Sequence, residues 1–293
     1  MKVGFIGLGR MGSGMAQRVL AGGHDLAVYD VVGERTAEFT RAGAHVAASI
    51  ADVAAGRDVV ITMLAEDAHV LHVVSASGGL SSSLPARAIH LAMGTYGIST
   101  IRALGAAHAK SGQTLVAAPV LGRPDLAATG QLGIVAAGPA EALRRCDPLF
   151  QIIGRRTVQA GAEPEAATAI KLANNLVLGC AIEAMGEAFS LIRKYGVMPE
   201  VFYDVMTEGL FSAPAYKVYG RIIVDETYDR AGSTINLNLK DANLILAAAD
   251  IVRVPLPSVN AFRDRLLGAI AHGDGEKDVA ALAREQARAS GLD

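Results

Sequence analysis

The chain has no tryptophan, and only 5% of its 293 residues are aromatic. Few side chains are therefore present on which unpaired bases could stack or which could anchor a peptide. Lysine and arginine total 27 against 29 for aspartate and glutamate, which gives a net charge of -2. A nucleic-acid-binding surface needs a block of positive charge, so no nucleic-acid partner is expected.

Cysteine is almost as scarce. Cys146 and Cys180 lie far apart, and neither belongs to a C-x-x-C pair, which argues against a disulfide scaffold and against a structural zinc site. His69 and His72 have a spacing that suits a metal on a helix, but no third ligand is apparent near them, so no metal is expected. This pattern predicts a protein of the reducing cytoplasm.

Long hydrophobic runs are missing as well. The N-terminus, MKVGFIGLG, breaks into glycines after a few apolar residues, and no uninterrupted apolar run reaches the roughly 18 to 20 residues that span a bilayer. We therefore expect a soluble, uncleaved protein without a membrane partner. Because 51% of the residues are hydrophobic and 19% charged, the chain can bury a core of one large or two ordinary domains.

The first half of the chain alternates short apolar runs with helical stretches that are rich in alanine and leucine. Such runs are typical of parallel strands that helices cover on both faces, because right-handed crossovers place a helix over the sheet. The pattern predicts a doubly wound α/β domain. The predicted strands are residues 2–6, 26–29, 58–64, 88–92, 114–120 and 132–136.

Beyond about Gly161 the pattern contains no further convincing strand. Residues 166–195 lack proline and are apolar nearly all round, which predicts a helix of about 40 Å that is buried on most sides and connects two domains. The second half is therefore expected to be all-helical. The other predicted helices are residues 199–208, 238–251, 257–272 and 277–290.

The sharpest motif is a glycine turn that follows the first predicted strand and opens a helix. It consists of Gly7, Leu8, Gly9, Arg10, Met11 and Gly12. Glycines at these positions allow a tight turn, a close approach of backbone to a pyrophosphate, and close packing of helix on strand. The helix N-terminus adds N–H donors and a positive dipole end for the phosphates. The motif therefore predicts a dinucleotide site.

Asp30 lies at the end of the second predicted strand. An acidic residue there can accept hydrogen bonds from both ribose hydroxyls and repels a 2′-phosphate, so NAD is the predicted cofactor. Arg35 is close enough in sequence to meet a phosphate, which keeps NADP open. Flavin and S-adenosylmethionine proteins use related glycine turns, so the first predicted strand and its glycine turn do not by themselves identify the ligand.

Lys171 and Asn175 are four residues apart and share one face of the long helix. Desolvation of a lysine in so apolar a helix would lower its pKa toward the range that is useful for proton transfer. Such a lysine could protonate or stabilise the alkoxide that develops when hydride reaches a carbonyl, and Asn175 could orient it. Taken alone, a lysine that packs its aliphatic stem and reaches water explains the position equally well.

Together these residues resemble the β-hydroxyacid dehydrogenase family, which includes 3-hydroxyisobutyrate dehydrogenase and tartronate semialdehyde reductase. Residues 3–16, VGFIGLGRMGSGMA, are similar to its N-terminal signature almost throughout, and the likeness extends over nearly the whole chain. The resemblance implies an NAD(P)-binding Rossmann domain over residues 1–162. It also implies a helical substrate-binding and oligomerisation domain, of the kind found in 6-phosphogluconate dehydrogenase, over residues 163–293. Catalysis would take place between them, in a homodimer or homotetramer.

The resemblance also assigns roles to individual residues. Lys171 stands where the family has its catalytic acid/base in a K-x-x-x-N helix, with Asn175 at the asparagine. Lys240, in the pair Lys240-Asp241, matches a lysine near the nicotinamide and substrate. Leu64 and Thr95 match positions on the cofactor side. Gly122 matches part of the substrate loop, and the resemblance thereby places Asn175, Gly122 and Lys240 at the substrate.

Two departures from the family pattern fall on substrate recognition. The usual loop D-A-P-V-S-G-G reads AAPVLGR at residues 117–123, so Leu121 replaces a carboxylate-binding serine. Arg123 could bind a carboxylate bidentately if its side chain points toward the substrate. The usual D-M-S-T reads AMGT at residues 92–95, which removes two polar groups. The identity of the substrate therefore cannot be transferred from the family.

The sequence predicts an enzyme that transfers hydride between a nicotinamide cofactor and a small β-hydroxy acid or its semialdehyde. Imine reductases are similar to this family and share its architecture, and a more apolar substrate loop suits imine or ketone reduction. They commonly replace the catalytic lysine, so Lys171 favours an alcohol and carbonyl couple. A noncatalytic dinucleotide-binding sensor is the alternative from another class, because it would keep the fold and Asp30 without needing an acid/base.

Overall fold

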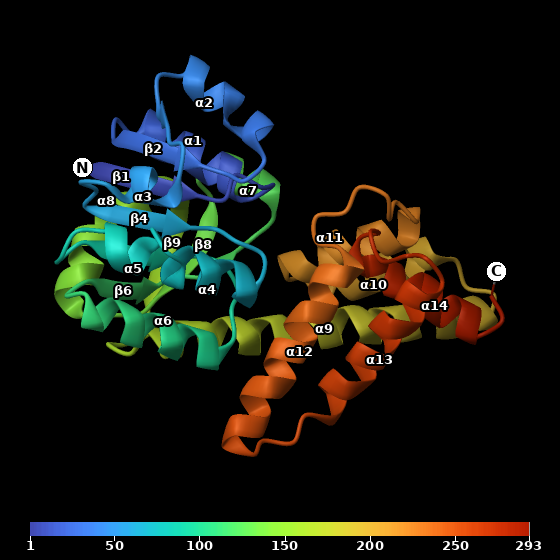
Figure 1. Ribbon diagram of the computed structural model, residues 1–293. Helices are drawn as coiled ribbons and strands as arrows, with labels where there is room; N and C mark the ends of the chain where they lie inside the picture. The colour runs from blue at the N-terminus through green and yellow to red at the C-terminus, as the bar shows by residue number, and fades with distance from the viewer. Residues whose placement is uncertain (293) are drawn as a thin grey trace. The chain divides into compact units, whose positions relative to one another are not determined.

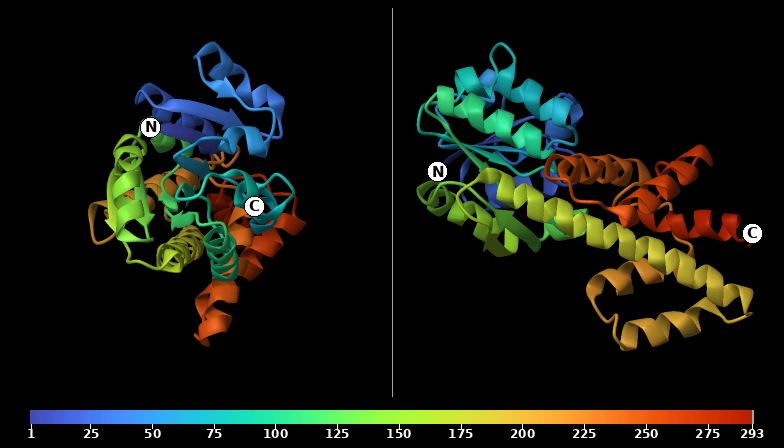
Figure 2. Two further views of the ribbon diagram at one scale, coloured as in Figure 1. Left: turned by 60° about the vertical axis from the view of Figure 1, so that its left-hand side comes forward. Right: turned by 90° about the horizontal axis from the view of Figure 1, so that it is seen from below.

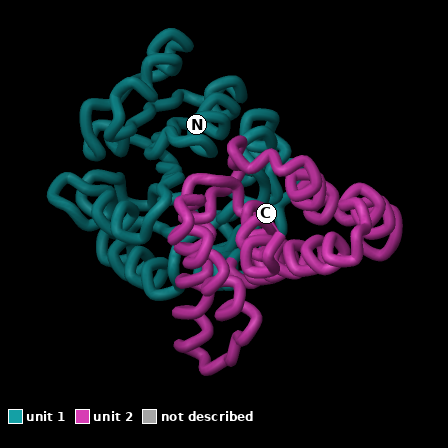
Figure 3. Tube along the Cα trace, turned by 90° about the vertical axis from the view of Figure 1, so that its right-hand side faces the viewer, with its two compact units in different colours: residues 1–171 teal, residues 172–293 magenta. Residues whose placement is uncertain are grey.

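The computed structural model describes residues 1–292, and the chain forms two compact units (Figure 3). The first unit comprises residues 1–171 and the second the residues from Leu172 onward. The chain passes from one unit to the other within a single helix, α9 (Pro164–Lys194).

The first unit contains a six-stranded parallel sheet in the order β3-β2-β1-β4-β5-β6 (Figure 1). This order confirms the predicted doubly wound sheet, and its direction reverses between β1 and β4, where such sheets bind their ligands. The short strand β3 was not predicted. The strands are β1 (Lys2–Ile6), β2 (Asp25–Tyr29), β3 (His45–Val46), β4 (Val59–Thr62), β5 (Ile89–Ala92) and β6 (Thr114–Ala117).

Helices cover both faces of this sheet because its strands are apolar on both sides. Val3 and Phe5 belong to a buried cluster with residues of α1 and α8, whereas Ile6 belongs to a second cluster with residues of α3, α4 and α6. Every residue of β4 and β5 is buried. The helical segments of this unit are α1 (Gly12–Ala21), η1 (Gly33–Thr36), α2 (Ala37–Arg41), α3 (Ile50–Ala54), α4 (Asp67–Ser75), α5 (Leu80–Ser83), α6 (Ile98–Lys110), α7 (Pro124–Ala128) and α8 (Ala140–Ile153).

A second, three-stranded sheet in the first unit differs from the sequence prediction. It consists of β7 (Val120–Leu121), β8 (Leu132–Ala136) and β9 (Gly154–Gln159), with β7 antiparallel to β8. The predicted strand 114–120 is therefore two strands in two sheets. Pro119 lies at the break, where it has no N–H to offer a ladder. The edge strand β9 was missed because Arg155 and Arg156 are exposed and hide any apolar pattern.

The second unit is helical, as predicted. α9 is continuous over 31 residues (Figure 2). The predicted helix 277–290 begins with a short 3-10 turn, η2, and α11 was not predicted at all. The helical segments that follow α9 are α10 (Pro199–Glu208), α11 (Pro214–Asp225), α12 (Ile235–Val252), α13 (Pro257–Ala271), η2 (Val279–Ala281) and α14 (Leu282–Ala289).

The prediction that α9 is buried on most sides is wrong for the chain on its own. Val177 is 66% exposed and Leu191 is 60% exposed. By length and composition, α9 is the one helix among residues 1–292 that could cross a membrane, and 39% of its most apolar window is buried within the protein. On one face, buried Glu183 forms an ion pair with Arg265 of α13, 3.0 Å away, so that face packs against protein.

The glycines inside α9 have a packing function. A β-carbon on Gly179 would lie 2.6 Å from the ring of Phe262 in α13, and one on Gly186 would lie 3.1 Å from the Cα atom of Ala283 in α14. Phe262 is 2% exposed, so its ring has little room to move. Residues that weaken an isolated helix thus allow α13 and α14 to pack closely on α9.

Replacement of Gly179 by alanine should therefore destabilise the protein. The added β-carbon overpacks the contact with Phe262 by about 1–3 kcal/mol, and about 1 kcal/mol of helix propensity offsets part of this. We expect the free energy of unfolding, measured by urea denaturation, to fall by about 1 kcal/mol. Gly105→Ala in α6 is the matched control, because its β-carbon would meet nothing closer than 3.8 Å. Equal stability of the two variants would contradict this account.

Candidate active site

The predicted dinucleotide motif forms a tight turn between β1 and α1. Gly7 has φ +97°, a conformation that side chains other than glycine rarely adopt. A β-carbon on Gly12 would lie 1.9 Å from the carbonyl oxygen of Gly7. Both glycines are therefore required by the protein's own backbone. Leu8 is buried beneath the turn, Arg10 is exposed, and Met11 occupies the residue before α1.

Gly9 differs from its two neighbours in the motif. Its φ is ordinary, and a β-carbon on it would meet no protein atom within 4 Å. No contact within the chain explains a glycine at this position, whereas the close approach of a pyrophosphate does. Gly9 also precedes the N-terminus of α1, which begins at Gly12 and offers positive dipole potential. The turn thus fits a dinucleotide.

Asp30 lies at the end of β2, where it ties two loops together. One carboxylate oxygen accepts the Leu8 N–H at 2.7 Å, and the other accepts the Val32 N–H at 2.8 Å. Arg35 lies 3.4 Å from the second oxygen, and the Asp30 side chain is only 4% exposed. Asp30 therefore shapes the glycine turn, a role that the sequence did not reveal. It also places a negative charge at the predicted ribose position, with one guanidinium beside it.

The predicted cofactor-side residues Leu64 and Thr95 follow β4 and β5, and Tyr96 connects their loops. The Tyr96 hydroxyl accepts the Leu64 N–H at 3.2 Å. A β-carbon on Gly94 would lie 2.4 Å from the Tyr96 ring and 2.7 Å from the Leu64 carbonyl oxygen. Glycine at residue 94 thus leaves room for the Tyr96 ring. This aromatic residue was not identified from the sequence.

Buried polar side chains extend from Tyr96 into the core. Tyr96 hydrogen-bonds to Thr62, whose hydroxyl lies 2.9 Å from His90 Nε2. His90 Nδ1 lies 2.8 Å from His108 Nε2, and His108 Nδ1 lies 2.7 Å from the Gln113 side-chain oxygen. Both histidines are fully buried. Their hydrogen bonds satisfy groups that burial would otherwise leave costly.

The donor and acceptor of each hydrogen bond in this series follow from Gln113. Its amide nitrogen donates to the Leu84 carbonyl at 2.6 Å, so its oxygen must accept from His108. His108 then accepts from His90, and His90 accepts from the hydroxyl of Thr62. Each imidazole thus needs one proton only. Burial lowers the pKa of His90 well below its usual value, reinforced by His108, and burial also lowers the pKa of His108.

The predicted substrate loop lies in the second sheet of the first unit. Leu121, in β7, packs against the cluster that contains Tyr96, so it contributes apolar contact and no donor. Gly122 is exposed and Arg123 is half-buried just before α7. A β-carbon on Gly14 of α1 would lie 2.8 Å from the Ala128 backbone nitrogen. This close approach fixes α7, and with it the end of the substrate loop, on the cofactor-side helix.

A cluster around Asp241 organises the second unit. Asn175 in α9 donates its side-chain N–H to one Asp241 oxygen at 2.7 Å, and Lys240 lies 3.0 Å from the other. Asp241 therefore orients two predicted substrate-binding residues, and its position in the K-D pair was the one signal for it. The hydrogen bond to Asp241 fixes the orientation of the Asn175 amide, and with it the direction in which the side-chain oxygen can accept a hydrogen bond.

Lys171 is half-buried in the first third of α9, one helical turn before Asn175. Its helix is positioned at the N-terminal end by Glu165, which accepts two hydrogen bonds from Arg102. His69 and His72 are exposed on α4. Among residues 1–292, no group of three or more potential metal ligands occurs.

Family models match both parts of the chain. Residues 2–161 match the NAD-binding domain of 6-phosphogluconate dehydrogenase. Residues 166–285 match a model described as NAD-binding of NADP-dependent 3-hydroxyisobutyrate dehydrogenase. An uncharacterised oxidoreductase of Bacillus subtilis, YfjR, is 39% identical over 282 residues, covering 96% of this chain and 98% of its own. The 3-hydroxyisobutyrate dehydrogenase of Pseudomonas aeruginosa is 30% identical over 282 residues, covering 94% of both chains.

Solved structures are similar over almost the whole chain. The 3-hydroxyisobutyrate dehydrogenase of Salmonella typhimurium superposes with a TM-score of 0.87 at 25% identity, covering 97% of this chain and 99% of its own. An imine reductase from a Pseudomonas species gives a TM-score of 0.65 at 20% identity, covering 97% and 98%. The second likeness is one of fold alone.

The buried histidines should make the protein acid-sensitive. Their folded-state pKa values lie below the unfolded value of about 6.5, so below that pH the unfolded chain binds protons that the folded chain rejects. Stability should therefore be complete above pH 6.5 and fall as the pH is lowered, by up to about 1.4 kcal/mol per pH unit for each neutral histidine. Urea denaturation between pH 7.5 and 5 measures this slope.

The variant His108→Gln should flatten that slope, because glutamine keeps hydrogen-bonding groups without a titrating proton. His72→Gln is the matched control, since His72 is exposed on α4 and should leave the slope unchanged. A slope in His108→Gln as steep as that of the unchanged protein would refute the assignment of neutral histidines.

Proposed function

The chain belongs to the β-hydroxyacid dehydrogenase family, and on that premise we propose which of its residues carry the reaction and on what substrate. It is an NAD(P)-dependent oxidoreductase that acts on CH–OH groups and transfers hydride to or from small hydroxy acids. We propose a β-hydroxy acid and semialdehyde couple of the 3-hydroxyisobutyrate or tartronate semialdehyde type. The observation that carries the proposal is Lys171 one turn from Asn175, whose amide is fixed by Asp241.

The first unit would hold the cofactor. The turn from Gly7 to Gly12 would take the pyrophosphate, Asp30 the adenosine ribose, and Leu64 and Thr95 the nicotinamide side. Bound nicotinamide supplies the carbon that accepts or gives up hydride. We propose NAD over NADP, because the Asp30 carboxylate repels a 2′-phosphate and Arg35, at 3.4 Å, already pairs with that carboxylate.

Proton transfer would fall to Lys171. As a neutral amine it takes the hydroxyl proton in the oxidative direction, and as an ammonium it returns the proton in reduction. Asn175 would orient Lys171 or the substrate through its side-chain oxygen, because its nitrogen is held by Asp241. Lys240 would add positive potential for an anionic substrate, although the Asp241 carboxylate 3.0 Å away offsets part of its charge.

Substrate recognition would depend on Arg123 more than in relatives that carry a serine in this loop. Leu121 packs into the apolar cluster and has no donor. Arg123 is adjacent to Gly122 and carries a planar guanidinium that can bind a carboxylate with two hydrogen bonds. A small carboxylate with one apolar neighbouring group therefore suits this loop.

Two other functions remain as rivals. The loss of polar groups at Leu121 and Gly94 favours imine or ketone reduction, and Lys171 opposes it. A noncatalytic sensor would need the glycine turn and Asp30 but not the arrangement of Asn175, Asp241 and Lys240 around one carboxylate. That arrangement supports an enzyme.

We propose that the helical unit forms a homodimer or homotetramer. Large apolar side chains are exposed on α9, on α10 and beside them: Val177, Leu191, Met198, Val205 and Leu210. Such a concentration is typical of a surface that another copy covers. Sedimentation equilibrium should give a mass above 30.3 kDa, reduced by Val177→Glu but not by Val158→Glu, an exposed control on β9. A monomer at micromolar concentration would contradict the proposal.

A substrate panel tests the proposed reaction. Oxidation of NADH and NADPH is followed by absorbance with methylmalonate semialdehyde, tartronate semialdehyde, succinic semialdehyde, glyoxylate and a cyclic imine. We expect turnover of at least one semialdehyde, with a higher kcat/KM for NADH than for NADPH. Turnover of the imine alone would support the first rival. Tight cofactor binding without any turnover would support the sensor.

The variant Lys171→Ala tests the proposed acid/base. Loss of proton transfer should lower kcat by about 100- to 10,000-fold, while the Kd for NADH stays within about twofold. Lys194→Ala, at the other end of α9, is the control and should keep full turnover. Full turnover by Lys171→Ala on a substrate that the unchanged enzyme reduces would refute the mechanism.

A further inference from the structure

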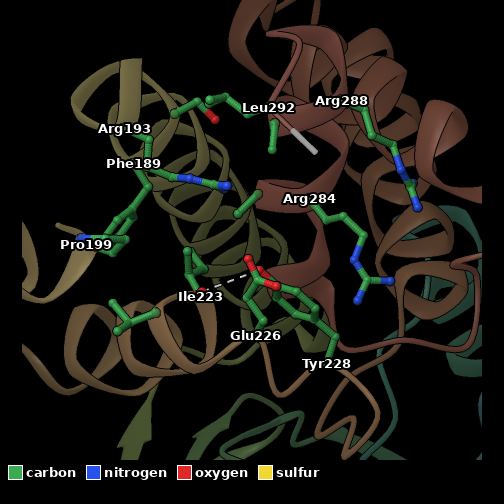
Figure 4. Close-up of a pocket in the computed structure, with 13 residues that line it drawn as sticks. Phe189, Arg193, Pro199, Ile223, Glu226, Tyr228, Arg284, Arg288 and Leu292 are labelled. Atoms are coloured by element: carbon green, nitrogen blue, oxygen red, sulfur yellow. Dashed lines mark hydrogen bonds between the residues drawn. The ribbon is translucent and has the colours of Figure 1, made fainter. Parts of the chain in front are cut away.

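The second unit contains a pocket that the proposed reaction does not use. Its volume is about 360 Å³, and it lies among the end of α9, α11 and its following turn, and α14 (Figure 4). None of the residues assigned above to the cofactor or the substrate lines it. A volume near the lower end of the range for small-molecule sites calls for a compact ligand.

One side of the pocket is apolar. Phe189 from α9, Ile223 from α11 and Ala287 from α14 line it, and their exposed fractions are 2%, 6% and 5%. These three side chains come from three helices, so the surface is fixed by the packing of the unit. It could accept a hydrocarbon group of a ligand with a gain from removing apolar surface from water.

Arginine side chains form the other side. Arg284 and Arg288 each use Nη1 to hold the two oxygens of buried Asp274, at 3.2 and 2.8 Å. Arg284 also lies over the Tyr228 ring, 4.9 Å from its centre. Asp274 thus anchors both side chains and offsets part of their charge. Arg288 Nη1 also donates to Glu285 at 3.2 Å, so acidic side chains within the chain hold both arginines.

Arg193 differs from these two arginines, because no acidic side chain among residues 1–292 holds its guanidinium. It is half-buried in the last turn of α9, and its guanidinium extends into the pocket (Figure 4). Among residues 1–292, no hydrogen bond or ion pair engages that guanidinium. A half-buried cation beside an apolar surface attracts a carboxylate, which would form charge-assisted hydrogen bonds with it.

We propose that this pocket binds a small organic monocarboxylate with a compact apolar body. The carboxylate lies on Arg193, and the body lies on Phe189, Ile223 and Ala287. Inorganic phosphate has no apolar body to lie on these three side chains, so the apolar surface favours the organic monocarboxylate. The inference goes beyond the proposed reaction and does not rest on it.

Benzoate is a suitable probe, with benzamide as its neutral counterpart and inorganic phosphate as the dianionic one. Binding to the full-length protein is measured by isothermal titration calorimetry at pH 7.5. We expect saturable benzoate binding with a Kd in the millimolar range or below, and at least tenfold weaker binding of benzamide and phosphate. Equal affinities for benzoate and benzamide, or for benzoate and phosphate, would overturn the proposal.

Substitutions inside and outside the pocket test whether benzoate binds there. Arg193→Gln should weaken benzoate binding at least tenfold, and Ala287→Met should weaken it by filling the apolar side. Arg230→Gln removes the same charge from an exposed position outside the pocket and should change the Kd by less than twofold. Thermal unfolding of each variant confirms that it is folded. Unchanged binding by Arg193→Gln would overturn the proposal.

Benzoate could also occupy the proposed substrate site, and Lys171→Ala separates the two sites. Benzoate affinity in Lys171→Ala should equal that of the unchanged protein. Loss of binding in Lys171→Ala but not in Arg193→Gln would assign benzoate to the substrate site and overturn the proposal. Failure of the substrate panel would leave this result unaffected, because the calorimetric readout needs no turnover.

Discussion

The first unit depends on a backbone contact in which the Gly7 carbonyl oxygen occupies the space of a β-carbon at residue 12. Only glycine at position 12 lets α1 begin this close to β1. The N-terminus of α1 then meets the edge of the sheet at the point where the strand order reverses. Asp30 reinforces this contact by holding the Leu8 N–H from the end of β2. The shape of the turn is therefore fixed by sterics within the chain, and of its three glycines only Gly9 would place a β-carbon more than 4 Å from any protein atom.

The cofactor-side loops after β4 and β5 depend on a different kind of restraint. Their hydroxyl and amide groups connect to the core through His90 and His108, whose protons all point in one direction because Gln113 donates to a carbonyl. Such a chain has one low-energy arrangement, and each member loses a partner if any other is charged. In the second unit, Asp241 has a comparable function on a smaller scale, because it orients Asn175 and Lys240 together.

Sequence reasoning succeeded where a local pattern determines the outcome. Short apolar runs that alternate with helical stretches predicted the parallel sheet, and the predicted strand 2–6 and helix 199–208 have the observed bounds. The predicted strand 132–136 also has the observed bounds, but it lies in the second sheet. It failed where contacts with residues distant in the sequence determine the secondary structure. Exposed Arg155 and Arg156 concealed β9, whose pairing with β8 is what makes it a strand. Pro214 was an available signal for α11, since proline suits the first turn of a helix, and it was overlooked.

The residues of the candidate site likewise fall into those that a sequence motif marks and those that it does not. The glycine turn and the K-x-x-x-N spacing are readable along the chain, because each lies within one turn or one helix. Tyr96 acts through Leu64, 32 residues away, so no local pattern marks it. Asp241 is marked only by its place in the K-D pair, and its bond to Asn175, 66 residues away, is not readable from that pair. The apolar face of α9 is likewise visible in the sequence, but whether Val177 is covered by this chain or by another molecule is not a property of its neighbours in sequence.

The contact between Gly94 and Tyr96 couples two residues of the loop that follows β5. A β-carbon at residue 94 would lie 2.4 Å from the buried Tyr96 ring and 2.7 Å from the Leu64 carbonyl oxygen, so a side chain at residue 94 and the tyrosine compete for the same space. Removal of the tyrosine alone would leave the Leu64 N–H without its side-chain partner, whereas the Thr62 hydroxyl would keep its hydrogen bond to His90. The effects of substitutions at residues 94 and 96 are therefore expected to be non-additive.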